Sequence, residues 1–361
     1  MQILVLNRGS SSVKLSLYDF KAAPKEPIAP HWEDKIEWKN VWDQGSIEKE
    51  LSAKLKDKRF DCIGHRVVHG GRKYQKSTLI NKEVKEEIRK LADLAPLHNL
   101  ADLEGIEIFE KLFPKCPQVA VFDTAFHHTM APEAIVYPGP YEWFEKGIQK
   151  YGFHGTSFQY CTKRAQHLLK KLPEKMVICH LGSGASLCAV KNGKSIDTTM
   201  GFTPLDGLMM DTRSGNVDPG ILLHLLKTQS VEDLSTDLYE KSGLLGLSGI
   251  SSDMRDVLEA SVTNPRAKLS LDVYLHRLCS MIGSMIGSLN GIDTLVFTAG
   301  IGENSTYIQD EVCKRLCFLG IHLKKQRDKG IISSPDSKVT VLLIHTQEAF
   351  EIALQTFEQM G

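Results

Sequence analysis

The side chains in this sequence that are best suited to chemistry are two arginines placed near glycines. Arg66 stands between apolar residues before Gly70 and Gly71, and Arg213 precedes Gly215. A guanidinium in such a position can bind a carboxylate or a phosphate through two parallel hydrogen bonds. For one arginine alone, a structural ion pair is an equally good interpretation.

Asp123 and His154 add a carboxylate and an imidazole to this set. Asp123 follows the apolar run 119–122, where a carboxylate either binds a metal or a proton or caps the next helix. His154 lies between Phe153 and Gly155 and has little to pack against, so donation to a ligand is the better interpretation. Two arginines, a histidine and an aspartate, together with the glycine turns described next, suit phosphoryl transfer to an anionic acceptor.

Glycine turns follow three of the apolar runs expected to be strands. In chain order they are 7–12, 180–184 and 298–304. Backbone N–H groups of such turns converge on phosphate oxygens, and serine adds hydroxyl donors. One of them would usually be only a tight turn. Three at strand ends favour a nucleotide phosphate site, because α/β folds bind ligands there.

Two common nucleotide motifs fail letter by letter. The segment 193–195 (GKS) would end a P-loop, but Cys188 stands where the loop glycine is required. Gly300 and Gly302 would begin a dinucleotide motif, but Ser305 replaces its third glycine. A Walker-type NTPase and a Rossmann dehydrogenase are both disfavoured.

Composition narrows the class of protein further. The chain has 361 residues, enough for two domains, and its 44 basic residues equal its 44 acidic ones. No basic field is present to hold nucleic acid or an anionic membrane. Eight scattered cysteines without a Cys-x-x-Cys pair, and no signal peptide before the first strand, predict reduced thiols in the cytoplasm. The apolar segment 278–289 is too short to span a bilayer and is expected to be a buried helix.

Alternating strand and helix patterns predict an α/β fold. A hairpin is expected from 3–6 and 13–18, and helices are expected over 83–95 and 348–360. Further buried strands are expected at 119–122, 176–180, 294–297 and 339–344. The hairpin pattern recurs at 177–190, almost half the chain away from the first, which suggests two domains of similar topology with the ligand between them.

Taken together, these motifs resemble the acetate kinase family from Met1 to the last helix. The matching segments occur in the family's order: NRGSSS (7–12), HRVVHGG (65–71), APLHN (95–99), FDTAFH (122–127), YGFHGTS (151–157), GFTPL (201–205), SSDMR (251–255) and TAGIGEN (298–304).

This resemblance implies an α/β fold of two actin-like (ribonuclease H-like) domains with a nucleotide cleft between them. Residues 1–124 and 350–361 would form the N-terminal domain. Residues 125–349 would form the C-terminal domain, with the nucleotide site and the interface of a homodimer.

Residue roles are also implied by the resemblance. Catalysis is expected from Asp123, His154 and Arg213. Substrate binding is expected from Arg66, Val68, Leu97, Phe153 and Pro204. Nucleotide binding is expected from Lys14, His180, Leu181, Gly182, Ser183, Gly184, Asp253, Met254, Arg255, Gly300, Ile301, Gly302, Glu303 and Asn304, with Ser10 and Ser12 as further phosphate-turn residues. Magnesium, with manganese as a substitute, is expected at Asn7 and Glu348.

The sequence departs from the usual family pattern at several of these sites. Arg8 stands where the family mostly has a small residue, Ser183 replaces an asparagine and Phe158 a histidine. Met254 replaces an aromatic residue, and Asp211 replaces a glycine near Arg213. A carboxylate at 211 either pairs with Arg213 and weakens its hold on phosphate, or points into solvent and contributes little.

The expected function is reversible phosphoryl transfer from ATP to acetate, which gives acetyl phosphate and ADP. The same chemistry on propionate or butyrate is an open alternative, because one methylene in an apolar pocket is worth only about 1–3 kcal/mol. A nucleotide-binding protein without kinase activity is a second alternative. It is disfavoured by the joint presence of both arginines, Asp123 and His154, since a binding module needs no acceptor-side arginine.

Overall fold

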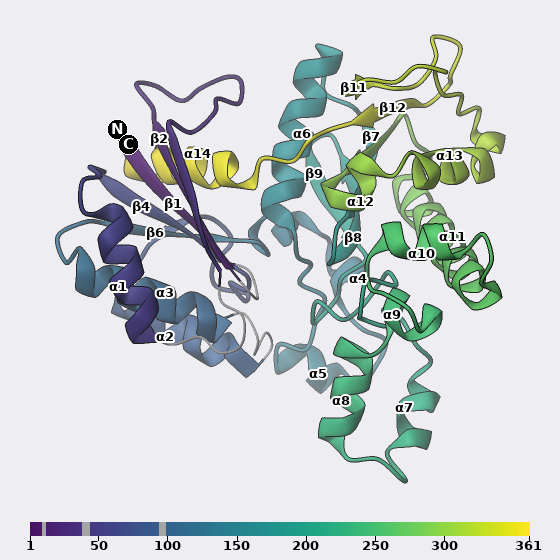
Figure 1. The fold of residues 1–361 in the computed structure, drawn as a ribbon, viewed down its shortest axis with the longest axis horizontal. Coiled ribbons are helices and arrows are strands. Elements are labelled where there is room, and N and C mark those ends of the chain that lie inside the picture. Colours follow the sequence, from purple (N-terminus) through teal and green to yellow (C-terminus); the bar gives the residue numbers. More distant parts are fainter. Residues whose placement is uncertain (9–11, 38–43, 94–98) are drawn as a thin grey trace. The chain divides into compact units, whose positions relative to one another are not determined.

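The computed structural model describes residues 1–8, 12–37, 44–93 and 99–361, which form two compact units (Figure 1). Unit 1 comprises Met1–His128, Phe153–Tyr160 and Gln347–Gly361. Unit 2 comprises Thr129–Gly152 and Cys161–Thr346. Both chain termini therefore belong to unit 1.

Unit 1 is an α/β unit built on one six-stranded sheet. Its strands are β1 (Gln2–Arg8), β2 (Ser12–Asp19), β3 (Trp32–Glu37), β4 (Cys62–Val67), β5 (Thr78–Leu79) and β6 (Gln118–Phe122). Its helices are α1 (Gln44–Leu55), α2 (Lys82–Lys90), η1 (Leu91–Asp93), α3 (Asn99–Leu112), η2 (Ala125–Thr129) and α14 (Glu348–Met360). The helix α6 (Gly155–Leu169) begins in unit 1 and ends in unit 2.

Unit 2 also contains a six-stranded sheet. Its strands are β7 (Lys175–Leu181), β8 (Ala185–Lys191), β9 (Lys194–Thr198), β10 (Thr294–Thr298), β11 (Gly330–Ile331) and β12 (Thr340–Leu343). Its helices are α4 (Pro132–Ile135), α5 (Tyr141–Glu145), α7 (Pro219–Leu225), α8 (Val231–Glu240), α9 (Gly243–Ser248), α10 (Met254–Ala260), α11 (Pro265–Leu289), α12 (Ala299–Asn304), α13 (Thr306–Arg315) and η3 (Cys317–Leu319).

The two sheets have the same topology. In space the first runs β3-β2-β1-β4-β6-β5, and the second, read in the matching direction, runs β9-β8-β7-β10-β12-β11. In each, the first three strands pair antiparallel, the next two pairs are parallel and the last pair is antiparallel. This agreement confirms the similar topology that the recurring hairpin pattern predicted.

Helices cover both faces of the unit 1 sheet, so no residue of its central strands β1, β4 and β6 is exposed. The helix α14 packs so closely on β4 that a Cβ added at Gly64 would collide with Thr356. On the other face, Leu51 of α1 and Phe109 of α3 join the core formed with Leu4 and other strand residues. Burial on both faces fixes the register of these strands and hence the positions of the residues at their ends.

Most expected elements are confirmed, with three differences. The helix expected over 83–95 is α2, which ends at Lys90 because Leu91 turns the chain into the single 3-10 turn η1. The turn expected at 298–304 is instead the last residue of β10 followed directly by the whole of the short helix α12. The segment 278–289 lies in α11, but it is buried on one face only: Leu278, Ile282 and Met285 are covered, whereas its serines and glycines are on the exposed side.

Two expectations from composition also have structural counterparts. All eight cysteines are free thiols, and five of them are buried. Among the described residues, no helix combines the length and the apolar character that a membrane-spanning segment needs.

Candidate functional site

Arg66, which is partly buried, and Asp123, which is buried, form an ion pair at the ends of two neighbouring parallel strands. The Nε and Nη2 atoms of Arg66 donate to Oδ2 of Asp123 at 2.9 and 2.5 Å. The other oxygen of Asp123 accepts from the hydroxyl of Thr156 at 2.7 Å. Burial alone would lower the pKa of Arg66. The nearby carboxylates of Asp123, Glu348 and Asp102 together have a larger, opposite effect, so the pKa is raised overall and the guanidinium stays charged.

The segment 151–157 docks onto the end of β6 through a glycine. The Gly155 N–H donates to the Asp123 carbonyl at 2.9 Å, and a Cβ at Gly155 would collide with that same oxygen. The preceding His154 adopts a φ of 57°, a conformation rare for residues with a side chain. Because Gly155 contacts Asp123 directly, the neighbouring residue His154 also lies near Asp123.

Three side chains hold the backbone of the loop that follows Arg66. The N–H of Val68 donates to Asp102, that of His69 to Asn99, and that of Gly70 to Thr124, at 3.0, 3.1 and 3.0 Å. The Asn99 amide also donates to the His69 carbonyl. The position of Val68, an expected substrate-pocket residue, is therefore fixed by α3.

Phe153 lies beside this loop. Its ring is buried and meets the His69 ring edge-on at 5.5 Å between centroids. Its carbonyl lies 3.0 Å from Nε2 of His127. Unit 1 thus brings together Arg66, Val68, Asp123, Phe153 and His154 of the expected site, while Leu97 and Ser10 lie outside the described residues.

Asn7 and Glu348, the expected metal ligands, lie next to each other. The Asn7 amide donates to Oε2 of Glu348 at 3.2 Å, and β1 pairs Asn7 with Lys14 of β2. Ser12 is the first residue of β2. An amide and a carboxylate are oxygen donors of the kind that Mg2+ uses, together with water and substrate phosphates. The pair therefore fits a magnesium ion, although the described residues contain no group of three or more His, Cys, Asp or Glu arranged for a metal.

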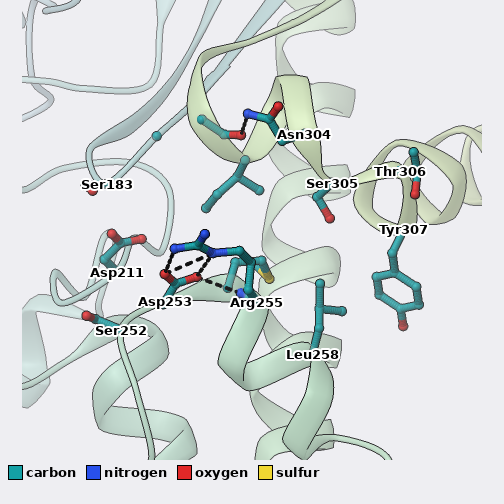
Figure 2. Close-up of a pocket in the computed structure, with 14 residues that line it drawn as sticks. Ser183, Asp211, Ser252, Asp253, Arg255, Leu258, Asn304, Ser305, Thr306 and Tyr307 are labelled. Atoms are coloured by element: carbon teal, nitrogen blue, oxygen red, sulfur yellow. Dashed lines mark hydrogen bonds and ion pairs between the residues drawn. The ribbon is translucent and has the colours of Figure 1, made fainter.

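Unit 2 contains an open pocket of about 700 Å3, within the size range of small-ligand sites. Figure 2 shows its lining residues. They are Gly182, Ser183, Asp211, Ser252, Asp253, Met254, Arg255, Leu258, Gly300, Ile301, Asn304, Ser305, Thr306 and Tyr307. Eight of them were expected to bind nucleotide, and they come from three segments far apart in the sequence.

A charged pair stands in the middle of this pocket (Figure 2). Nε of Arg255 donates to both carboxylate oxygens of Asp253, and Nη2 of Arg255 donates to Oδ2 at 2.5 Å. These hydrogen bonds lower the pKa of Asp253 to about 2. Asp253 also caps α10 by accepting from the Arg255 N–H. Both side chains are exposed and can exchange this pairing for contacts to a ligand.

Six of the expected nucleotide residues lie outside the pocket lining, and one of them, Lys14, belongs to unit 1. His180 and Leu181 are buried at the end of β7, and Gly184 is the turn residue whose carbonyl accepts from Gly182 N–H. Gly302 packs against β7. Glu303 points back to the backbone, where it accepts from the N–H groups of Ala299 and Thr346 and contacts His345.

Arg213 and Asp211 do not form the direct ion pair that the sequence suggested. Nη1 of Arg213 donates to the carbonyl of Pro204 at 3.3 Å. Asp211 instead hydrogen-bonds Ser183 and lines the pocket, and it attracts Arg213 only at longer range. The pKa of Asp211 is raised overall, mainly because the carboxyl is partly buried and to a smaller extent because Asp253 is also negative. The hydrogen bond to Ser183 and the positive charge of Arg213 act in the opposite direction. The Asp211 carboxyl thus faces the unit 2 pocket.

The sequence did not reveal Thr156, Asn99 and Asp102 as supports of the site. Thr156 lies two residues after His154 in the motif 151–157, and this position was the one feature of the sequence that could have indicated its role. The two α3 residues act through the loop 68–71, and nothing in their own spacing indicates that contact.

Comparison with known proteins identifies the family. The model of the acetokinase family matches residues 45–354. The chain belongs to the acetokinase family. A curated relative is "Acetate kinase" from Rippkaea orientalis, 48% identical over 98% of both chains.

Solved structures agree with this assignment. The chain is similar to acetate kinase from Porphyromonas gingivalis, with 37% identity, a TM-score of 0.87 and full coverage of both chains. It is also similar to a propionate kinase from Francisella tularensis, with 39% identity, a TM-score of 0.88 and 98% coverage of both chains. The α/β fold of two actin-like domains expected from the motifs is confirmed. The family assignment makes the chain a kinase that acts on a carboxylate with ATP as substrate.

Proposed function

We propose that this protein transfers the γ-phosphoryl group of ATP directly to acetate in a reversible, magnesium-dependent reaction. One observation carries the proposal: a partly buried arginine, Arg66, bound to the buried carboxylate of Asp123 beside His154, in a chain of the acetokinase family. A guanidinium at this position suits a small carboxylate substrate, which it can bind by two N–H groups.

The proposed reaction needs no covalent enzyme intermediate. A carboxylate oxygen of acetate forms a bond to the γ-phosphorus while the bond to the β,γ-bridging oxygen breaks, and ADP leaves with that oxygen. Arg66 holds the acceptor, with Val68, Leu97, Phe153 and Pro204 as the walls around its methyl group. Asp123 orients Arg66, and His154 and Arg213 stabilise charge on the transferring group, a role in which an arginine contributes roughly 10³ to 10⁵ in rate.

Asn7 and Glu348 are proposed to hold Mg2+, or Mn2+ in its place. Their side chains already lie within hydrogen-bond distance and supply an amide and a carboxylate. When bound, the metal neutralises charge on the ATP phosphates. Lys14, paired with Asn7 across β1 and β2, adds a positive charge on the same side.

The unit 2 pocket is proposed as the nucleotide site. Its glycine segments 182–184 and 300–302 offer N–H groups to phosphates, and Arg255 with Tyr307 offers surfaces for the base. In this proposal, unit 2 corresponds to the C-terminal domain with the nucleotide site that the resemblance implied, and unit 1 to the N-terminal domain. Ser10, Ser12, His180 and Glu303 are proposed as supporting residues.

Propionate is the second candidate substrate, because a propionate kinase is among the similar structures. Initial rates with acetate, propionate and butyrate, measured by trapping the acyl phosphate with hydroxylamine, separate the candidates. We expect the highest kcat/KM with acetate. A higher value with propionate would reassign the substrate, and no product with any of the three would overturn the kinase proposal.

A homodimer in the cytoplasm is the proposed state of the protein. The helix α7 supports this proposal, because it buries none of its residues and exposes Ile221 and Leu223, the latter at 69%. An apolar helix left uncovered on one chain suits an interface between two copies. Sedimentation of the purified protein as a monomer would contradict it.

A further inference from the structure

Asp102 is a buried carboxylate next to the proposed acetate site, and the proposed reaction gives it no role. It lies on α3, is only 6% exposed, and accepts from the Val68 N–H at 3.0 Å. It lines a small cavity together with Arg8 and Arg66. Its negative charge is therefore held between two guanidinium groups in a place with little water.

Arg8 is the second guanidinium that lines this cavity. Its Nη1 atom donates to the Ala101 carbonyl and to Glu104, the latter at 3.3 Å, and its charge attracts Asp102. Arg8 thus extends from β1 to α3 and brings a positive charge to the helix that carries Asp102.

Binding of acetate would change the charge balance of this cluster. Arg66 is already paired with Asp123, so Arg8 is the second positive charge that opposes Asp102. Arg8 is itself paired with Glu104, so a substrate carboxylate at Arg66 would be a fourth negative charge, after Asp102, Asp123 and Glu104, beside only two positive ones. When several carboxylates share such a site, their mutual repulsion raises the pKa of one of them, and that carboxylate takes up a proton.

We propose, on the basis of the function proposed above, that acetate binds together with one proton and that Asp102 takes up this proton. Asp102 is the group best placed to do so, because Asp123 is held by Arg66 and Thr156 in direct contacts. Arg8 sets the pH range in which uptake occurs. By linkage, acetate then binds more weakly as the pH rises above the range in which Asp102 ionises.

The groups around Asp102 agree with this assignment. Burial raises the pKa of Asp102 to about 7, while the Val68 N–H, Arg66 and Arg8 lower it and Asp123 raises it. From β4, His65 also lines the cavity, but burial lowers its pKa to about 4, so it stays neutral near pH 7. Glu104, on the same helix as Asp102, is paired with Arg8.

The first test is the KM for acetate between pH 6 and 8.5 in the parent enzyme and in Asp102→Asn. Asparagine can still accept from the Val68 N–H, but it mimics the protonated carboxyl. In the parent, we expect KM to rise with pH by up to tenfold per unit above about 7. In Asp102→Asn, we expect a low and nearly constant KM. A purely structural role for Asp102 predicts the opposite, a raised KM with an unchanged pH profile.

Two further variants complete the test. Arg8→Gln removes the positive charge, so the rise in KM should begin at a higher pH than in the parent. Glu107→Gln is the matched control, since Glu107 lies on α3 but pairs with Arg89 on the surface. It should reproduce the parent profile. If Asp102→Asn is unstable, the shift expected for Arg8→Gln still decides the question.

Calorimetry gives an independent measurement. Titration of the enzyme with acetate, in the presence of Mg2+ and ADP and in buffers of different ionisation enthalpy, reports protons taken up. We expect close to one proton at pH 8 in the parent and none in Asp102→Asn. An active enzyme with a flat KM profile and no uptake would overturn this inference alone. An enzyme that forms no acyl phosphate would overturn the proposed function as well.

Discussion

Two nitrogens of Arg66 donate to a single oxygen of Asp123, at 2.9 and 2.5 Å. The pair joins the ends of β4 and β6, whose parallel register places Arg66 beside Val121 and Val67 beside Phe122. Because the other Asp123 oxygen is bound by Thr156, the carboxylate has little freedom to turn. This arrangement fixes the orientation of the Arg66 guanidinium. The separate roles proposed for Arg66, Asp123 and Thr156 can therefore be tested by substituting each residue in turn.

Arg66 and Arg213 should differ in which kinetic constant they control. Arg66→Ala removes the proposed partner of the acetate carboxylate, so KM for acetate should rise far more than KM for ATP. Arg213→Ala removes a charge needed mainly during transfer, so kcat should fall by roughly 10³ or more. Steady-state kinetics with each substrate varied will measure both effects. The same defect in both variants would show that the separate roles are wrong.

Thr156 should contribute to turnover through Asp123. Thr156→Val keeps the shape of the side chain but removes a hydrogen bond to a buried charge, worth about 1.5–3 kcal/mol. We expect kcat to fall by roughly tenfold or more, with KM for ATP nearly unchanged. Thr156→Ser restores the hydroxyl and should recover most of the rate. A Thr156→Val enzyme with the parent kcat would show that Asp123 needs no such support.

Asp211 should affect nucleotide binding more than turnover. Its carboxylate faces the pocket beside Ser183, where phosphate is proposed to bind, and it makes no direct ion pair with Arg213. Asp211→Gly removes the repulsion, which at a solvated site amounts to about 1 kcal/mol, so KM for ATP should fall severalfold. A marked rise in kcat at constant KM would instead support long-range competition for Arg213.

Asp102 should make the folded state less stable as pH rises. Its pKa is raised by burial to about 7, whereas an unfolded aspartate ionises near 4. Between these values the folded state binds more protons than the unfolded state, so stability falls with increasing pH. The gain in unfolding free energy from Asp102→Asn should therefore grow between pH 5 and 8, by at most about 3 kcal/mol. Denaturant unfolding of both proteins at the two pH values will measure it, and an equal difference at both would contradict the assigned ionisation.

Much of the fold and of the candidate site could be predicted because the informative residues follow apolar strands. Asp123 and Gly182 come directly after runs whose burial on both faces is visible in the sequence. Contacts made across the chain could not be predicted in the same way. Glu303 belongs to a nucleotide motif, yet its carboxylate caps backbone N–H groups, because Ala299 begins α12 with a φ of 65°. Asp102 acts through Val68, and only the packing of α3 on the loop makes that contact.

The orientation of charged side chains was also beyond the sequence. Asp211 lies two positions from Arg213, and that spacing suggested a pair. The turn in which the Met210 N–H donates to the Arg213 carbonyl instead directs Asp211 to Ser183 and Arg213 to Pro204. Local spacing predicted which residues lie near one another in the chain but not which partner each side chain contacts.

The central claim is that this protein transfers phosphoryl groups between ATP and acetate. Phosphorus NMR of the protein mixed with ATP, Mg2+ and acetate tests it most directly, because acetyl phosphate and ADP have signals of their own. We predict that both products appear in equal amounts, that ATP forms again when acetyl phosphate and ADP are supplied, and that Asp123→Ala abolishes both. Hydrolysis of ATP to ADP and inorganic phosphate without acetyl phosphate, from a folded protein at saturating acetate, would contradict the account.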